Sequence, residues 1–200
     1  MSVFLFKEAD VEKAVSRVLM LIEEADPIKA SIGLPFYWMA EKTAKAGFKV
    51  LLAGQGADEL FGGYQRYVNE YLSHGKEKVS RTMFNEVIKL NESNLERDMK
   101  ISSFHNLELR LPFVSYQIVE FAMGLPTELK IDRRADTLRK LILRKVAENI
   151  GLPTLIAAKP KKAIQYSTGV NNVLKRIAKK QKATVSEYVK NLFLSKMSEN

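Results

Sequence analysis

Residues 49–59 combine features that could bind a phosphate group. An apolar run leads into a glycine-rich turn and then into two acidic residues, in the order Leu52-Ala53-Gly54-Gln55-Gly56-Ala57-Asp58-Glu59. A strand that ends in Gly-x-Gly and continues into a helix places backbone N–H groups at the carboxyl edge of a sheet, where α/β proteins bind phosphate-bearing ligands. Asp58 has a second interpretation as a helix cap. The pattern favours a nucleotide-type ligand and leaves both roles of Asp58 open.

Positive charge is concentrated in the second half of the chain. The formal net charge is +9. Residues 1–100 contain 14 basic and 15 acidic side chains, whereas residues 101–200 contain 18 and 8. Part of the excess lies at Lys159, Lys161 and Lys162, and part in the segment 175–182. Such a cluster attracts phosphates on a nucleotide, a nucleic acid or an acidic partner, although a solvated helix face explains residues 175–182 equally well.

The composition excludes several other classes of site. The 200 residues contain no cysteine, which removes disulfides, thiolate metal sites and a cysteine nucleophile. The two histidines, His74 and His105, have no partner at metal-ligand spacing. No apolar run approaches the roughly 18 residues of a membrane helix, and the amino terminus lacks the basic region of a signal peptide. We therefore expect a cytoplasmic protein that does not bind membranes.

The first 58 residues alternate between strand and helix patterns. Residues 3–6 are short, apolar and β-prone, and Asp10 is a candidate cap for a helix with an apolar face. A second helix is predicted to begin near Pro35, because proline suits the first helical turn, and to end at Gly47. The apolar run 49–54 is typical of a strand buried on both faces of a parallel sheet.

Beyond residue 58 the pattern is helical, and we predict no further strand. Residues 138–150 have helical spacing, with Asp136 as a candidate cap, and Thr184 to Glu187 fit a capping box. The sequence thus predicts one predominantly helical α/β domain over residues 1–200, with a strand-and-helix part to residue 73 and a helical part from 74. Parallel sheets usually have more strands, so we expect the missing ones upstream or on another chain.

The whole string from Ala53 to Tyr64 resembles the signature of asparagine synthetase synthase domains, Ser-Gly-Glu-Gly-Ser-Asp-Glu-Leu-Phe-Gly-Gly-Tyr, and nine of the twelve positions match. The resemblance continues through residues 107–113, 121–130, 138–144 and 159–166, in the same order. It implies the C-terminal part of an ATP-pyrophosphatase domain, a Rossmann-like fold of the adenine nucleotide alpha hydrolase type.

The resemblance also implies a reaction that uses ATP and Mg²⁺. In this family the side-chain carboxylate of aspartate attacks the α-phosphate of ATP, pyrophosphate leaves, and ammonia then displaces AMP to give an amide. Asp58 matches the aspartate that holds Mg²⁺ and pyrophosphate. Lys161, or Lys162 if the register shifts by one residue, matches the lysine that stabilises the adenylation transition state. The expected partners are a nucleotide and a small, aspartate-like carboxylate.

Further residues of the string take their expected roles from the same resemblance. Gly54, Gly56 and Glu59 are expected to contact the ATP, together with Lys162. Gln55 stands where the family has a catalytic glutamate that handles protons, and an amide cannot act as a general base. Gln55 is therefore expected to orient a substrate or a water molecule.

Two further departures limit what this sequence is expected to do. The 200 residues contain no Ser-Gly-Gly-x-Asp-Ser phosphate loop, so we expect an upstream segment or a partner chain to supply it. Glutamine hydrolysis, which requires a cysteine, is excluded for these residues. The alternatives are a non-catalytic remnant that binds a nucleotide or a partner and, less favoured because no recognised motif accompanies the charge, a nucleic-acid-binding module. A homo-oligomer is left open.

Overall fold

The computed structural model describes residues 3–132 and 138–199, which fold into two compact units. The first unit consists of Met1–Leu51, Asn94–Leu109 and Lys162–Asn200. The second consists of Leu52–Ser93 and Arg110–Lys161. The chain thus passes from one unit to the other several times. The expectation of one domain with a division at residue 73 stays a prediction.

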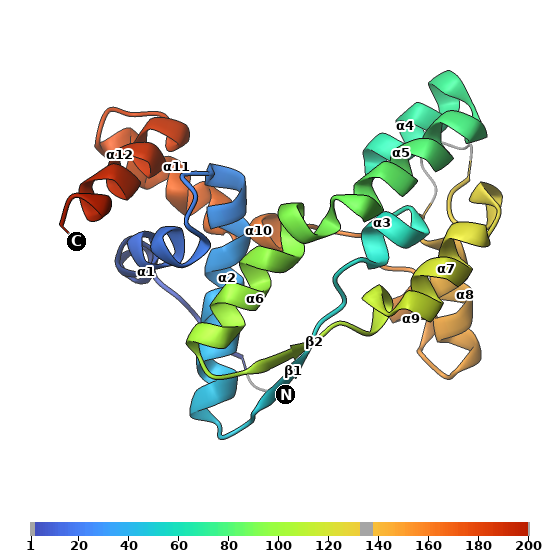
Figure 1. The fold of residues 1–200 in the computed structure, drawn as a ribbon, viewed down its shortest axis with the longest axis horizontal. Helices are drawn as coiled ribbons and strands as arrows, with labels where there is room; N and C mark the ends of the chain where they lie inside the picture. The colour runs from blue at the N-terminus through green and yellow to red at the C-terminus, as the bar shows by residue number, and fades with distance from the viewer. Residues whose placement is uncertain (1–2, 133–137, 200) are drawn as a thin grey trace. The chain divides into compact units, whose positions relative to one another are not determined.

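The first unit is a group of helices (Figure 1). Its long helices are α1 (Glu8–Ile22), α2 (Pro27–Lys45), α6 (Glu96–Phe104), α11 (Val170–Lys180) and α12 (Val185–Met197), with the short α10 (Ile164–Ser167). Helix α1 contacts α2, α6, α11 and α12. Its buried face consists of Val11, Ala14, Val15, Val18, Leu19 and Ile22. The predicted apolar face of this helix is confirmed.

The caps of the first unit differ in part from the sequence expectation. The cap of α1 is Lys7, not Asp10; the Asp10 carboxylate instead accepts a hydrogen bond from the Lys7 backbone N–H at 2.7 Å. The predicted capping box of α12 is confirmed, because the Thr184 hydroxyl accepts from the Glu187 N–H at 3.2 Å and the Glu187 carboxylate accepts from the Thr184 N–H at 2.7 Å.

Helix α2 begins eight residues before the predicted start at Pro35. The Asp26 carboxylate accepts hydrogen bonds from the backbone N–H groups of Ile28 and Lys29, at 2.7 and 2.8 Å, and Pro27 occupies the first turn. Pro35 is buried inside the helix. Both prolines suit a helix start, but only Pro27 follows a residue with a capping side chain. The prediction was wrong because it chose the second proline.

Two short parallel strands, β1 (Val50–Leu52) and β2 (Glu108–Arg110), form the sheet of the described residues. Hydrogen bonds run from Glu108 N to Lys49 O at 2.8 Å and from Ala53 N to Arg110 O at 3.0 Å. The prediction of a strand in 49–54 is confirmed, but its burial is not, because Val50 is 37% and Leu52 68% exposed. In the described residues, the apolar run 49–54 therefore does not form the strand buried on both faces that it predicted.

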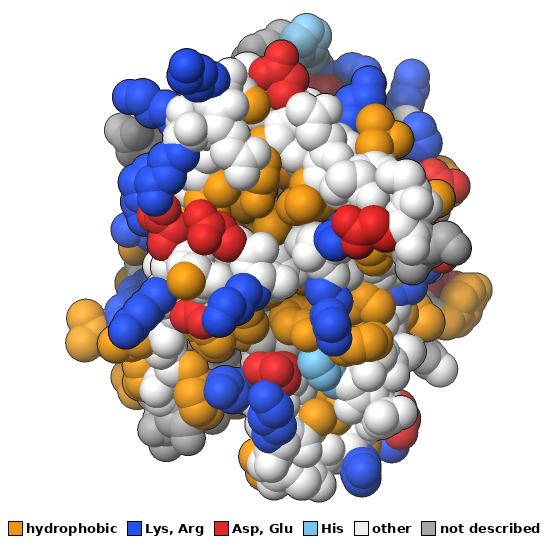
Figure 2. All heavy atoms as spheres, turned by 90° about the vertical axis from the view of Figure 1, so that its left-hand side faces the viewer, with side chains coloured by type: hydrophobic (Ala, Val, Ile, Leu, Met, Phe, Trp, Pro, Cys, Tyr) orange, Lys and Arg blue, Asp and Glu red, His pale blue; other side chains and the backbone are white. Residues whose placement is uncertain are grey.

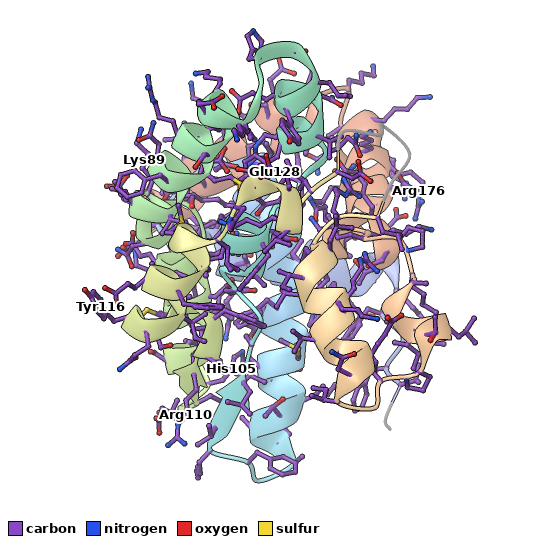
Figure 3. All side chains as sticks on the ribbon, turned by 90° about the vertical axis from the view of Figure 1, so that its right-hand side faces the viewer. Lys89, His105, Arg110, Tyr116, Glu128 and Arg176 are labelled. Atoms are coloured by element: carbon purple, nitrogen blue, oxygen red, sulfur yellow. The ribbon has the colours of Figure 1, made fainter. Side chains whose placement is uncertain are left out.

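Two other strand predictions were wrong. Residues 3–6, which belong to the described part of the chain, form no strand, and all four are exposed. Strand β2 was not predicted, because three residues are too few for a pattern. Glu108 and Arg110 share its exposed side, as a strand requires, and Figure 3 shows the Arg110 side chain pointing away from the ribbon.

The second unit is built from short helices. They are α3 (Ala57–Phe61), α4 (Gln65–His74), α5 (Lys76–Ile88), α7 (Tyr116–Gly124), α8 (Leu141–Asn149) and α9 (Thr154–Ala157), with 3-10 turns at Pro112–Val114 and Thr127–Leu129. A π-helical turn, Asn91–Leu95, precedes α6. One core cluster consists of Tyr67, Val68, Tyr71, Val79, Met83 and Ile131, and another of Leu60, Phe61 and Ala122. The predicted helix at 138–150 is confirmed by α8, and Asp136 lies outside the described residues.

These elements confirm a predominantly helical α/β fold, whereas the Rossmann-like assignment stays a prediction. Within residues 3–132 and 138–199, no helix has both the length and the apolar character needed to cross a membrane.

Candidate functional site

The turn before α3 requires glycine at Gly56. Gly56 caps α3 with φ +87°, in the left-handed region, and a β-carbon there would lie 2.9 Å from Cγ2 of Val114. The positive φ and the close contact with Val114 both disfavour any residue with a side chain at position 56. Gly54 differs, because a β-carbon on it would meet no atom within 4 Å. The turn is therefore tightly packed at its second glycine and open at its first.

Asp58 is the second residue of α3 and does not cap it, so the capping interpretation was wrong. Its side chain lies against Gly63. A β-carbon built on Gly63 would stand 1.8 Å from Oδ1 of Asp58, and the Gly63 N–H donates to the Asp58 carbonyl at 2.7 Å. The sequence Gly62-Gly63 thus leaves the room that the carboxylate occupies. Any side chain at position 63 would therefore displace the Asp58 carboxylate.

Two lysines converge on the Asp58 carboxylate from distant parts of the second unit. The Lys140 ammonium lies 2.8 Å from Oδ1, and the Lys161 ammonium lies 3.3 Å from Oδ2. All three side chains are partly exposed, between 22 and 23%. Two positive charges share one negative charge, so these three side chains keep a net charge of about +1 at neutral pH.

Burial and the two lysines shift the pKa of Asp58 in opposite directions. Burial by itself would raise the pKa, but the ammonium groups of Lys140 and Lys161 outweigh it and hold the pKa of the Asp58 carboxyl below its ordinary value. Asp58 is therefore an anion throughout the neutral range, and the two lysines have a fixed counter-charge.

Glu59, the next residue, is held in a different environment. It is 4% exposed, and its carboxylate accepts a hydrogen bond from the Tyr64 hydroxyl at 2.6 Å. Burial raises the pKa of Glu59, although the hydrogen bond from Tyr64 opposes the shift. The side chain of Glu59 is thus directed to Tyr64, and the Lys161 ammonium lies 4.7 Å from the centroid of the same tyrosine ring.

The chain is similar to known proteins over most of its length. The chain matches the family described as asparagine synthase over residues 2–78 and 69–200. The chain belongs to the asparagine synthase family. The Methanocaldococcus jannaschii protein named Putative asparagine synthetase 1 (glutamine-hydrolyzing) is 33% identical over 217 aligned positions, which cover 92% of this chain and 40% of that protein.

Two further relatives match at similar identity. Asparagine synthetase domain-containing protein 1 of Mus musculus is 36% identical over 146 positions, 72% of this chain and 22% of that protein. The asparagine synthetase (glutamine-hydrolyzing) of Triphysaria versicolor is 32% identical over 171 positions, 84% of this chain and 28% of that protein. The chain thus spans less than half the length of each of these members of the asparagine synthase family.

The structure brings together some of the residues that family resemblance selected and leaves others apart. Asp58 and Lys161 are in direct contact. Lys162 is exposed and belongs to the first unit. Gln55 is partly buried in the turn before α3. The roles assigned to these residues stay predictions, but the ion pair favours Lys161 over Lys162 as the lysine of the site.

Sequence reasoning missed Lys140, the nearer of the two lysines on Asp58. Lys140 lies in segment 138–144, which matched the asparagine synthase family, but no role was attached to it there. It caps α8 at the N-terminus with φ +58°, a conformation unusual for lysine, and its backbone therefore turns sharply where the helix begins. No local feature of the sequence distinguishes Lys140, because Arg139, the residue before it, is also basic.

The site suits an anion better than it suits a bare metal ion. Over residues 3–132 and 138–199, no group of three or more His, Cys, Asp or Glu side chains is placed to hold a metal. Both oxygens of Asp58 face ammonium groups, and Glu59 faces Tyr64. A bare Mg²⁺ would meet a single carboxylate and two repelling cations. The described residues fit Mg²⁺ alone poorly, and Asp58 as a magnesium ligand stays a prediction.

Proposed function

We propose that the chain forms the pyrophosphate-holding part of an ATP-dependent amide ligase of the asparagine synthetase type. In the proposed reaction a carboxylate oxygen of an aspartate-like substrate attacks the α-phosphorus of ATP, and the bond to pyrophosphate breaks. Ammonia then attacks the acyl carbon, loses a proton, and AMP departs with the electrons of the broken C–O bond. The products are an amide, AMP and pyrophosphate.

The observation that carries the proposal is the pair of lysines on Asp58. Pyrophosphate gains negative charge as it departs, and cations placed in advance lower the energy of that state. Lys140 and Lys161 are partly exposed and share one carboxylate, so each can exchange an oxygen of Asp58 for an oxygen of phosphate. Asp58 would keep both ammonium groups close together until the anion arrives.

The charge balance of the site also bears on magnesium. A polyphosphate brings several negative charges, which offset both the lysines and a divalent cation. We therefore propose that any Mg²⁺ enters bound to phosphate oxygens and not as a free ion.

Gln55 stands where the family resemblance leads one to expect a glutamate, and this difference affects the proposed chemistry. Because an amide cannot accept a proton as a carboxylate does, Gln55 is proposed to orient a substrate or a water molecule. The proton lost by the nitrogen nucleophile would then pass to solvent or to another group. The same substitution supports the second candidate function, a non-catalytic domain that binds a nucleotide without making the amide.

A nucleic-acid-binding function has less support. On the face shown in Figure 2, lysine and arginine side chains are interspersed with acidic ones. Two cations of α11, Arg176 and Lys180, are both paired with Glu8 of α1. These pairs reduce the charge that the basic segment 175–182 presents to a partner.

Isotope exchange between pyrophosphate and ATP tests the proposal. The chain is assayed with ATP, Mg²⁺ and aspartate, alone and mixed with a family segment that contains the Ser-Gly-Gly-x-Asp-Ser string. We expect no exchange without the segment and exchange with it. Lys161→Ala should then lower the exchange rate at least tenfold, as loss of a charge-assisted contact to phosphate does.

Lys179→Ala is the matched control, because Lys179 is an exposed lysine on α11. It should leave the exchange rate unchanged. Equal losses from Lys161→Ala and Lys179→Ala would mean that only the diffuse positive charge matters, and would reject the site. Nucleotide binding that persists in the mixture without exchange would favour the non-catalytic alternative.

A further inference from the structure

Tyr64 connects Glu59 of α3 to Lys161. It is the residue before α4, it is partly buried, and its ring centroid lies 5.5 Å from that of Tyr67 in the core of the second unit. Its hydroxyl donates to Glu59 at 2.6 Å. Burial, followed by the charge of Glu59, raises the pKa of Tyr64, so the hydroxyl stays protonated as the donor. The ring is thus held both by packing and by a hydrogen bond.

The face of this ring attracts cations. The Lys161 ammonium lies 4.7 Å, and the Arg66 guanidinium carbon 4.0 Å, from the ring centroid. Arg66 is itself fixed, since its Nε donates to Glu86 of α5 at 3.1 Å, and Glu86 also accepts from the hydroxyl of Tyr67. Both distances lie within the range at which an aromatic ring attracts a cation.

The position of the Lys161 side chain depends on such contacts, because its backbone belongs to no helix or strand. Residues 158–163 form no helix or strand and join α9 to α10. The lysine side chain has four rotatable bonds, and its contact with Asp58, at 3.3 Å, is the longer of the two that Asp58 makes with lysine. Exposed ion pairs alone order a long side chain weakly.

We propose that Tyr64 is a positioning residue that holds the Lys161 ammonium beside Asp58 through the face of its ring. The placement of Lys161 is a property of the second unit itself, whereas its catalytic consequence rests on the proposed function. Glu59 contributes to this placement through Tyr64, because its carboxylate accepts the hydroxyl hydrogen. Packing against Tyr67 also keeps the ring in place, so the ring face, and not the hydroxyl, is the group that holds the cation.

Two substitutions separate the ring from the hydroxyl. Tyr64→Phe keeps the ring and the packing but loses the bond to Glu59. Tyr64→Leu removes the ring, and Tyr64→Met provides a second ringless variant if the leucine variant does not fold. The lysines are dimethylated with a ¹³C label, which preserves their charge, and the Lys161 signal is assigned by its loss in Lys161→Arg. An ammonium above a ring has a signal displaced by the ring current.

We expect the Lys161 signal to be displaced in the wild type, to stay displaced in Tyr64→Phe, and to move to the position of the exposed Lys179 in Tyr64→Leu or Tyr64→Met. An unchanged signal in the ringless variants, or the same movement in Tyr64→Phe as in Tyr64→Leu, would overturn the proposal. This measurement needs no ligand, so it stands or falls apart from the proposed function.

Pyrophosphate exchange then tests the consequence in the completed mixture. Loss of the ring should lower the exchange rate about two- to fivefold, the range expected of an exposed cation–π contact, and Tyr64→Phe should stay near the wild type. The double variant Tyr64→Leu, Lys161→Ala should be no slower than Lys161→Ala alone, because the ring then has nothing to position. Additive losses would show that Tyr64 acts independently of Lys161 and would overturn the proposed route.

Discussion

Asp98 in the first unit and Asp58 in the second are both carboxylates paired with cations, yet their surroundings are opposite. Asp98 lies beside Arg97, and the two side chains are 0 and 3% exposed. The guanidinium donates from Nε to Oδ1 at 2.7 Å and from a terminal nitrogen to Oδ2 at 3.0 Å. The contact is bidentate and pairs one cation with one anion, so the charges of these two side chains cancel.

Asp58 has two cations and remains in contact with water. Its lysines approach one oxygen each, at 2.8 and 3.3 Å, and the cluster keeps an unbalanced positive charge. A closed, neutral pair such as Arg97 with Asp98 contributes to structure, because any change leaves a buried charge alone. An open cluster with an excess cation can exchange partners. The ratio of charges and the access of water, more than the presence of an ion pair, distinguish a binding site from a structural pair.

The largest expected effect follows from breaking the closed pair. Asp98→Ala would leave the Arg97 guanidinium buried without its counter-ion, so we expect a loss of about 3 to 5 kcal/mol in the free energy of unfolding. Asp58→Asn should cost no more than about 1 kcal/mol, because its lysines can turn to water. Urea unfolding measures both. A larger loss for Asp58→Asn than for Asp98→Ala would reverse the comparison.

A smaller effect is expected from Gly63→Ala, which moves the Asp58 carboxylate without removing its charge. The new β-carbon would overlap Oδ1 of Asp58, so the side chain or α3 must shift. Overpacking of this kind costs about 1 to 3 kcal/mol of unfolding free energy. Pyrophosphate binding, measured by calorimetry in the completed mixture, should weaken as well.

Gly54→Ala is the control for that substitution, because its β-carbon would meet no atom within 4 Å. It should leave the free energy of unfolding nearly unchanged. Equal losses for the two glycines would mean that the chain needs glycine for backbone freedom and not for the room given to Asp58.

Features that depend on neighbouring residues could be predicted from the sequence, whereas contacts between distant residues could not be predicted from local patterns. The apolar face of α1 and the capping box of α12 were predictable, because both depend on residues within a few positions of each other. Asp58 and Lys161 could be selected by family resemblance, although they are far apart in sequence.

Lys140 could not be selected, because its role depends on a contact across more than eighty residues and on a left-handed backbone that lysine rarely adopts. Strand β2 was missed because its alternation of charged, apolar and charged residues covers only three positions, too few to distinguish a strand from a loop. Pro35 shows the limit of a local rule, since it lies inside α2 although proline is typical of the first helical turn.

The smallest expected effect, and the finest test, uses the opposite pKa shifts of the neighbours Asp58 and Glu59. The lysines hold the pKa of Asp58 below its ordinary value, so Asp58 adds stability above its unfolded pKa and loses it as pH falls through the folded pKa. Burial raises the pKa of Glu59, so Glu59 adds stability below its unfolded pKa and loses it as pH rises through the folded pKa.

Asp58→Asn and Glu59→Gln should therefore change the pH dependence of the free energy of unfolding in opposite directions. Measured by urea unfolding between pH 3 and pH 7 in the presence of a chelator, the stability of the wild type relative to Asp58→Asn should increase with pH. Relative to Glu59→Gln it should decrease with pH, because glutamine still accepts the Tyr64 hydroxyl but avoids burying a charge. Profiles that tilt in the same direction would show that the two carboxylates share one environment, and the open, cation-rich character assigned to Asp58 alone would be wrong.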